Sequence, residues 1–137
     1  MAYPYSGLGI LDLTTSLFTP IPRPIIRYPS DGIMRWQIAF TPDGSQVYWQ
    51  DVGGEEPAIY RSQIDGSGLT KIGELPGGFS VEFSPDLTAI AYVVFDEQAR
   101  ALSLQASNID GSGAVEIDKT PDIGTGGIFS HSWRPLP

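Results

Sequence analysis

The sequence predicts an all-β fold built from β-propeller blades, each with four antiparallel strands. The motif Phe-(Thr/Ser)-Pro-Asp begins at Phe40 and again at Phe83, 43 residues later, and Ile-Asp-Gly-Ser-Gly begins at Ile64 and Ile109, 45 residues apart. Repeats of this length, made of short strands and turn residues, are typical of propeller blades or solenoid turns. The composition agrees, because 16 Gly and 12 Pro among 137 residues supply many turns.

The first complete repeat, residues 34–76, is predicted to form one blade. Apolar and other residues alternate from Met34 to Phe40, which is the period-2 pattern of a half-buried strand. Thr41-Pro42-Asp43-Gly44 and Asp65-Gly66-Ser67-Gly68 are turn sequences that favour hairpins. The strands after the first are expected at Gln46–Val52, Ala58–Ile64 and Leu69–Ile72.

The second complete repeat, residues 78–118, has the same order of strands and turns. Its strands are expected at Phe79–Phe83, Ala89–Phe95, Ala101–Ile109 and Ala114–Ile117. Helix is the competing interpretation for Gln98 to Leu104, because Ala, Arg, Leu and Gln favour it. The equivalence of this segment with Ala58–Ile64 of the first repeat favours strand.

A third copy of the repeat is split between the two ends of the chain. Residues 1–21 hold the last three strands, expected at Met1–Tyr3, Gly9–Leu13 and Leu17–Ile21, and residues 127–135 hold the first strand. Trp133 there occupies the position of Phe40 and Phe83. The proline-rich linker 22–33 is expected to be extended and stiff. The whole chain is therefore predicted to be a single half-propeller of three blades.

These phrases resemble the repeats of TolB-like β-propellers. The resemblance is carried by Phe-Thr-Pro-Asp-Gly and Phe-Ser-Pro-Asp, each followed by Val-Tyr-Trp or Ile-Ala-Tyr and then by Ile-Asp-Gly-Ser-Gly. Such blades occur in periplasmic binding proteins, in the gating domains of prolyl-oligopeptidase-like enzymes and in scaffolds, so the resemblance implies a fold more than a function. Family members usually carry six or more blades and often an export signal, and this chain differs in both respects.

Three blades cannot close a ring of normal curvature, so the sequence predicts assembly. We expect a homodimer with six blades, closed by strands exchanged between chains. Its interface residues are Ile128, Phe129, His131 and Trp133 of one chain and Met1, Ala2, Tyr3 and Tyr5 of the other. The alternative is a fragment of a longer propeller, such as a peptidase gating domain.

Composition argues against several function classes. Sixteen acidic and eight basic residues give a net charge of −8, which opposes binding to nucleic acid or an anionic membrane. The chain has no cysteine and only one histidine, and it lacks a Gly-x-Ser-x-Gly motif, so no zinc site, other metal site, cofactor or enzymatic activity is predicted. The Asp-Gly-Ser-Gly segments lack the alternating carboxylates of calcium loops and are expected to be turns.

The predicted function is a non-enzymatic scaffold or protein-interaction module. A ligand, if bound, is expected at the mouth of the central channel, near Arg35, Phe79, Phe129 and His131. The alternative is a carbohydrate or small-ligand binder, since Tyr48 and Trp49 point to opposite sides of a strand and one of them would be exposed. The N-terminus lacks the pattern of a signal peptide and no stretch is long and apolar enough to span a membrane, so a soluble chain is expected, in a compartment that the sequence does not identify.

Overall fold

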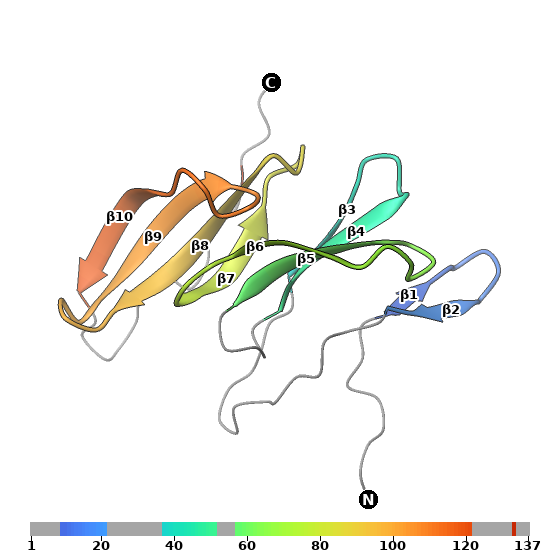
Figure 1. The fold of residues 1–137 in the computed structure, drawn as a ribbon, viewed down its shortest axis with the longest axis horizontal. Helices are drawn as coiled ribbons and strands as arrows, with labels where there is room; N and C mark the ends of the chain where they lie inside the picture. Colours follow the sequence, from blue (N-terminus) through green and yellow to red (C-terminus); the bar gives the residue numbers. More distant parts are fainter. Residues whose placement is uncertain (1–8, 22–36, 52–56, 122–132, 134–137) are drawn as a thin grey trace, which may run out of the picture.

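The computed structural model describes residues 9–21, 37–51, 57–121 and 133. Within these ranges the chain forms ten strands and no helix. Figure 1 shows two four-stranded antiparallel sheets and a two-stranded hairpin, arranged in the order of the sequence. The predicted all-β fold with four-stranded antiparallel sheets is confirmed.

Blade 1 is the sheet with strand order β3-β4-β5-β6. Its strands are β3 (Ile38–Phe40), β4 (Gln46–Asp51), β5 (Ala58–Gln63) and β6 (Thr70–Glu74). Strand β6 continues two residues beyond the predicted end because Gly73 and Glu74 still pair with β5. The predicted start of the first strand, at 34–36, lies outside the described residues.

Blade 2 is the sheet with strand order β7-β8-β9-β10. Its strands are β7 (Gly78–Phe83), β8 (Ala89–Asp96), β9 (Ala101–Asn108) and β10 (Val115–Pro121). The helix considered for Gln98 to Leu104 is not formed, because Ala101 to Leu104 pair with β8 on one side and with β10 on the other. Strand β10 extends past the predicted Ile117, around an irregularity between Glu116 and Asp118.

The N-terminal hairpin consists of β1 (Gly9–Leu11) and β2 (Phe18–Pro20). Both strands are shorter than predicted because the turn already begins at Asp12, whose Oδ1 accepts hydrogen bonds from the amides of Thr14 and Thr15. The predicted strands at Met1–Tyr3 and 127–135, apart from Trp133, and the linker lie outside the described residues. The split third blade therefore stays a prediction.

The apolar cores lie between neighbouring sheets rather than within one sheet. One core joins blade 1 to blade 2, and its buried members are Ile59, Leu75, Val81, Ile90 and Tyr92. The other joins the hairpin to blade 1 through Ile21, Val47 and Trp49, with Ile10 and Tyr60 packed against them. Each blade is thus stabilised mainly by its neighbours, as expected when sheets pack face to face.

Candidate functional site

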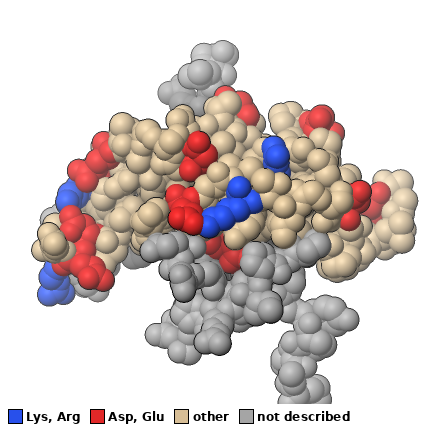
Figure 2. All heavy atoms as spheres, viewed as in Figure 1, with Lys and Arg blue, Asp and Glu red and all other residues tan. Residues whose placement is uncertain are grey.

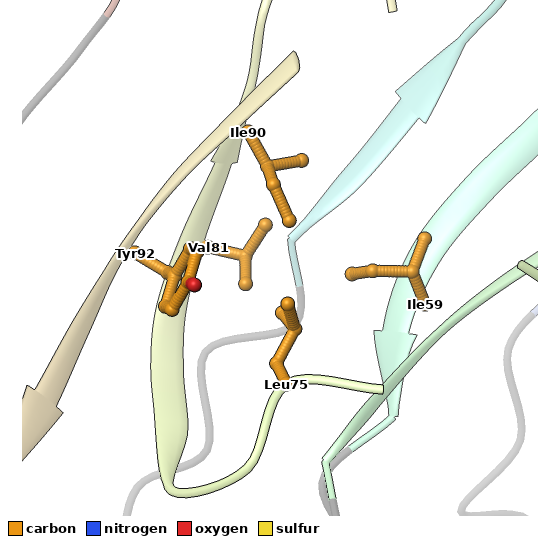
Figure 3. Packing of buried hydrophobic residues seen from close by; sticks show 5 residues of the cluster. All are labelled: Ile59, Leu75, Val81, Ile90 and Tyr92. Atoms are coloured by element: carbon orange, nitrogen blue, oxygen red, sulfur yellow. The ribbon is translucent and has the colours of Figure 1, made fainter. Parts of the chain in front are cut away.

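The contact between blades 1 and 2, called here the central seam, shows how this chain joins one blade to the next. Ile59 from β5 and Leu75 after β6 meet Val81, Ile90 and Tyr92 from blade 2 (Figure 3). Four of the five side chains are at most 1% exposed, and Tyr92 is 5% exposed. Full burial of one such apolar side chain contributes about 1.5–3 kcal/mol. The central seam is therefore a large part of the stability of the described fold.

Aromatic side chains extend the central seam toward the first strands of the blades. Tyr48 of β4 and Phe83 of β7 pack edge to face, with ring centroids 6.4 Å apart. This arrangement is one of the two preferred geometries of aromatic pairs. Phe83, from the repeated Phe-Ser-Pro-Asp motif, therefore binds its blade to the preceding one in addition to leading into a turn.

Gln50 forms a polar link across the same seam. Its side chain is 2% exposed and its Nε2 donates a hydrogen bond to the carbonyl of Gly78, at 3.1 Å. The amide of Val81 donates to Gln50 Oε1, at 3.4 Å. Strand β7 has an irregularity between Phe79 and Glu82, with Ser80 at φ 55°. Gln50 thus provides partners for backbone groups beside a bulge, where the ladder is disrupted.

Two glycines allow a turn of blade 2 to press against strand β6. A Cβ added to Gly73 would lie 2.0 Å from the carbonyl oxygen of Asp110, and one added to Gly111 would lie 2.6 Å from that of Glu74. Gly111 also has φ 83°, a conformation that favours glycine. The Asp-Gly-Ser-Gly segment therefore serves two purposes, because it closes a hairpin and fits against the neighbouring blade.

The contact between the hairpin and blade 1 is arranged like the central seam. In the hairpin, Ile10 and Ile21 occupy the positions that Ile59 and Leu75 occupy in blade 1. The cross-strand pair Ile10–Thr19 corresponds to the pair Ile59–Gly73. Trp49 is fully buried there and stacks on Tyr60, with centroids 5.9 Å apart.

This second contact is less complete than the central seam. Ile38 and Phe40 of β3 are 41% and 51% exposed, whereas Val81, which occupies the position of Ile38 in blade 2, is fully buried. The indole nitrogen of Trp49 is buried and has no hydrogen-bond partner among the described residues, although buried polar groups are normally paired. Apolar side chains of blade 1 thus stay more exposed on the side that faces the hairpin than in the central seam.

Apolar side chains are also exposed at both ends of the described structure. On the hairpin these are Leu11, Leu13, Leu17 and Phe18, which are 55–86% exposed. On β10, Val115 and Ile117 are 56% and 60% exposed. Exposed apolar groups that cluster in this way often mark interaction sites.

Trp133 is the one described residue of the predicted C-terminal strand. Its Nε1 donates a hydrogen bond of 3.0 Å to the carbonyl of Glu82 in β7. Phe83, at the equivalent position one blade earlier, packs against Tyr48 of the blade before it. Trp133 therefore contacts the first strand of blade 2.

The repeated aspartates stabilise turns. Asp43 Oδ1 accepts hydrogen bonds from the hydroxyl of Thr41 and from the amide and hydroxyl of Ser45, and these lower its pKa to about 2. Asp86 is held in the same way by Ser84 and Thr88, and its pKa is also lowered. Hydrogen bonds from serine likewise lower the pKa of Asp65 and Asp110. These carboxylates are thus engaged in local structure.

Of the predicted channel-mouth residues, the structure describes only Phe79. It lies in β7, partly buried and paired with Val93. Arg35, Phe129 and His131 are outside the described residues, as are the predicted interface residues Met1, Ala2, Tyr3, Tyr5 and Ile128. The predicted ligand site therefore stays a prediction.

The expectation that Tyr48 or Trp49 offers an exposed ring to a sugar is not met. Trp49 is fully buried, and Tyr48 is partly buried against blade 2. Both faces of the strand are covered because a blade has a neighbour on each side. Among the described residues, no three His, Cys, Asp or Glu side chains group in a way that could hold a metal ion. No helix in this part of the chain has the length and apolar character to cross a bilayer.

Sequence reasoning missed the residues that join the blades. Gln50 carries no visible signal, because the second repeat has Val93 at the equivalent position. The exposed apolar residues of the hairpin do carry a sequence signal. Leu13 and Leu17 flank Thr-Thr-Ser, where the other two hairpins have Asp-Gly-Ser-Gly.

Comparison with solved structures identifies the architecture. A protein assigned as TolB from Agrobacterium tumefaciens matches with a TM-score of 0.58 at 18% identity, over 82% of this chain and 41% of that chain. A chain of a nidogen–laminin complex matches with a TM-score of 0.55 at 16% identity, over 82% of this chain and 40% of that one. The chain has a β-propeller fold. This fits the predicted resemblance to TolB-like blades.

The likeness to these two proteins is limited to the propeller fold. The chain spans about two fifths of the length of the propeller proteins it matches. No protein-family model matches the sequence, and no curated protein matches it significantly. At these identities the match describes the backbone arrangement, while function depends on the residues of a site.

Proposed function

We propose that this chain is a non-enzymatic propeller module that closes a six-bladed ring with a second copy of itself and serves as a scaffold for protein interactions. The carrying observation is the incomplete contact between the hairpin and blade 1. Ile38 and Phe40 remain 41% and 51% exposed there, while Val81, at the position of Ile38, is fully buried in the central seam.

Ring closure gives these surfaces a partner. Propellers have four to eight blades, and the described residues make two blades and a hairpin. Two copies supply six blades if each hairpin is completed by strands Met1–Tyr5 of its own chain and Ile128–Trp133 of the other. A two-fold dimer of this kind is the commonest form of assembly. It also covers strand edges that would otherwise recruit unrelated chains.

The hydrogen bonds of the polar side chains support a structural rather than a catalytic module. Gln50 binds backbone groups of the next blade, and the turn aspartates bind neighbouring hydroxyls and amides. A catalytic site would instead gather titratable groups with perturbed pKa values in a cleft. Figure 2 shows acidic side chains spread over the visible face rather than gathered in one place.

The test is the mass in solution, measured by light scattering and native mass spectrometry over a range of concentrations. We expect twice the 14.8 kDa of one chain. The variant Ile38→Glu should shift the population to monomer, because it places a charge in the incomplete contact. Gln63→Glu is a control, since Gln63 is exposed at the end of β5 and lies on the opposite face of the strand from Tyr60, which packs against the hairpin core.

A stable monomer at every concentration would overturn the dimer. It would indicate that the missing blades come from a longer polypeptide. Equal effects of Ile38→Glu and Gln63→Glu would show that the contact between the hairpin and blade 1 is not where the second copy binds.

A further inference from the structure

The N-terminal hairpin has two apolar sides, and only one of them is covered. Ile10 points toward blade 1 and packs against its core. Leu11 and Phe18 are paired across the hairpin and therefore point to the opposite side, since neighbouring residues in a strand alternate. They are 55% and 62% exposed. The hairpin thus presents an apolar face, the Leu11–Phe18 face, away from the other described residues.

The contact between blade 1 and the hairpin shows what such a face packs against. Tyr60, which follows Ile59 as Leu11 follows Ile10, points from blade 1 toward the hairpin and stacks on Trp49. Tyr60 and Leu11 thus both lie on the face of their sheet that points toward the blade that comes earlier in the ring. The Leu11–Phe18 face therefore requires an earlier blade, which the described part of the chain does not contain.

Blade 2 has an open face, defined here as the apolar surface around Ile117 that would meet a following blade. Ile72 of β6 is the extra residue at the irregularity between Ile59 and Tyr60, and it packs against the central seam. Ile117 of β10 is the extra residue at the matching irregularity in blade 2. It points toward the position of a following blade and is 60% exposed. Trp133 contacts the first strand of blade 2, where its indole N–H donates a hydrogen bond to the carbonyl of Glu82.

We propose that the Leu11–Phe18 face binds the open face of blade 2 of a second copy, at Ile117. This proposal rests on the homodimer proposed above and names its sheet-to-sheet contact, in addition to the exchanged strands. A second copy is the occupant because the two open faces belong to one chain and correspond to faces that are covered elsewhere in it, Ile117 to Ile72 of the central seam and Leu11 to Tyr60 of the contact between blade 1 and the hairpin. Residues 9–21 carry a single charge, on Asp12, so the hairpin brings little charge of its own to the contact. The hairpin end of the molecule is mainly tan in Figure 2.

The chemistry of the hairpin also suits a contact between chains. Within the chain, a turn of blade 2 meets β6 through glycines and backbone carbonyls. The hairpin instead offers large apolar side chains. Association of separate chains has to overcome lost translational and rotational freedom, so it needs more apolar burial than a contact between tethered blades.

The experiment combines two charge substitutions, Phe18→Lys and Ile117→Glu, in the full chain. Each variant alone should raise the dimer dissociation constant at least about tenfold, the usual effect of losing one interface anchor. An equimolar mixture should dimerise more tightly than either variant alone. In the mixed dimer one contact pairs the introduced lysine with the introduced glutamate and the other contact is unchanged.

Leu69→Lys is the control, because Leu69 is 39% exposed on a turn of blade 1 and should leave the dissociation constant unchanged. Circular dichroism checks that each variant is folded, which is expected because the substituted side chains are exposed. If the unmodified chain dimerises and Phe18→Lys and Ile117→Glu dimerise equally well, the contact is wrong while the dimer stands. If the mixture dimerises no more tightly than either variant alone, the contact is likewise wrong while the dimer stands. If the unmodified chain is monomeric, the proposed dimer fails and the contact fails with it.

Discussion

Replacing Gln50 by leucine tests how far one buried side chain holds the two blades together. Leucine has a similar volume but can make no hydrogen bond, so the substitution removes the links to the Gly78 carbonyl and the Val81 amide with little change in packing. Both backbone groups stay in the seam, next to a side chain position that is 2% exposed.

The expected cost follows from these two groups. A buried donor or acceptor that loses its partner costs about 1–3 kcal/mol, and the 3.4 Å bond to Val81 belongs at the low end. Burying the leucine side chain returns about 1.5–3 kcal/mol relative to exposure, which offsets part of the loss. We expect the free energy of unfolding to fall by about 1 kcal/mol. Gln50→Ala should cost more, because it also leaves a cavity.

Urea unfolding followed by circular dichroism measures this change. All variants are compared at one protein concentration, because assembly makes apparent stability depend on concentration. The control is Gln63→Leu, in an exposed position of β5, which should stay within about 0.5 kcal/mol of the unmodified chain. Hydrogen exchange adds a local readout, since the Val81 amide should lose protection in Gln50→Leu. A Gln50→Leu variant as stable as Gln63→Leu, with Val81 still protected, would refute the reasoning.

Two further predictions concern the turns. Gly111→Ala and Gly113→Ala both place a side chain at positive φ, 83° and 65°, at a shared cost of about 1–2 kcal/mol, but only the first drives a Cβ to 2.6 Å from the Glu74 carbonyl. Thermal unfolding should therefore show Gly111→Ala less stable by a further 1–3 kcal/mol or so, and equal losses would exclude a special role for the contact with β6. Asp43 has a folded pKa of about 2, below its ordinary 3.8, so its stabilisation is present above pH 3.8 and is lost as the pH falls through that interval. Urea midpoints measured through this interval should fall less steeply for Asp43→Asn than for the unmodified chain or for the surface variant Glu97→Gln, and parallel curves would contradict this.

The strands and hairpins were predictable because their signals are local. Thr41-Pro42-Asp43-Gly44 and the Asp-Gly-Ser-Gly segments specify tight turns through side-chain hydrogen bonds within a few residues. The prediction of strand ends was less accurate where pairing with a neighbouring strand decides them. Strand β10 continues to Pro121 because β9 offers partners that far, which no property of residues 118–121 indicates.

The candidate site was predicted less well, because it consists of contacts between blades. The sequence pointed to an exposed aromatic ring in β4, yet Trp49 is fully buried against the hairpin. It gave no indication that Gln50 would reach the backbone of β7, since those residues are 28 and 31 positions away. The expected channel-mouth site, of which only Phe79 is described, stays a prediction.

The sequence by itself determined the architecture of this protein. Turn residues at fixed spacing and alternating apolar residues act over a few positions, so they define four-stranded blades before any long-range contact forms. Only the tertiary structure decided which apolar side chains become core and which remain as surface. Ile72 and Ile117 follow the same local pattern, yet the first is packed against a neighbouring blade and the second is 60% exposed. The physical reason is that burial depends on what lies across the seam, and for Ile117 no described part of the chain lies there.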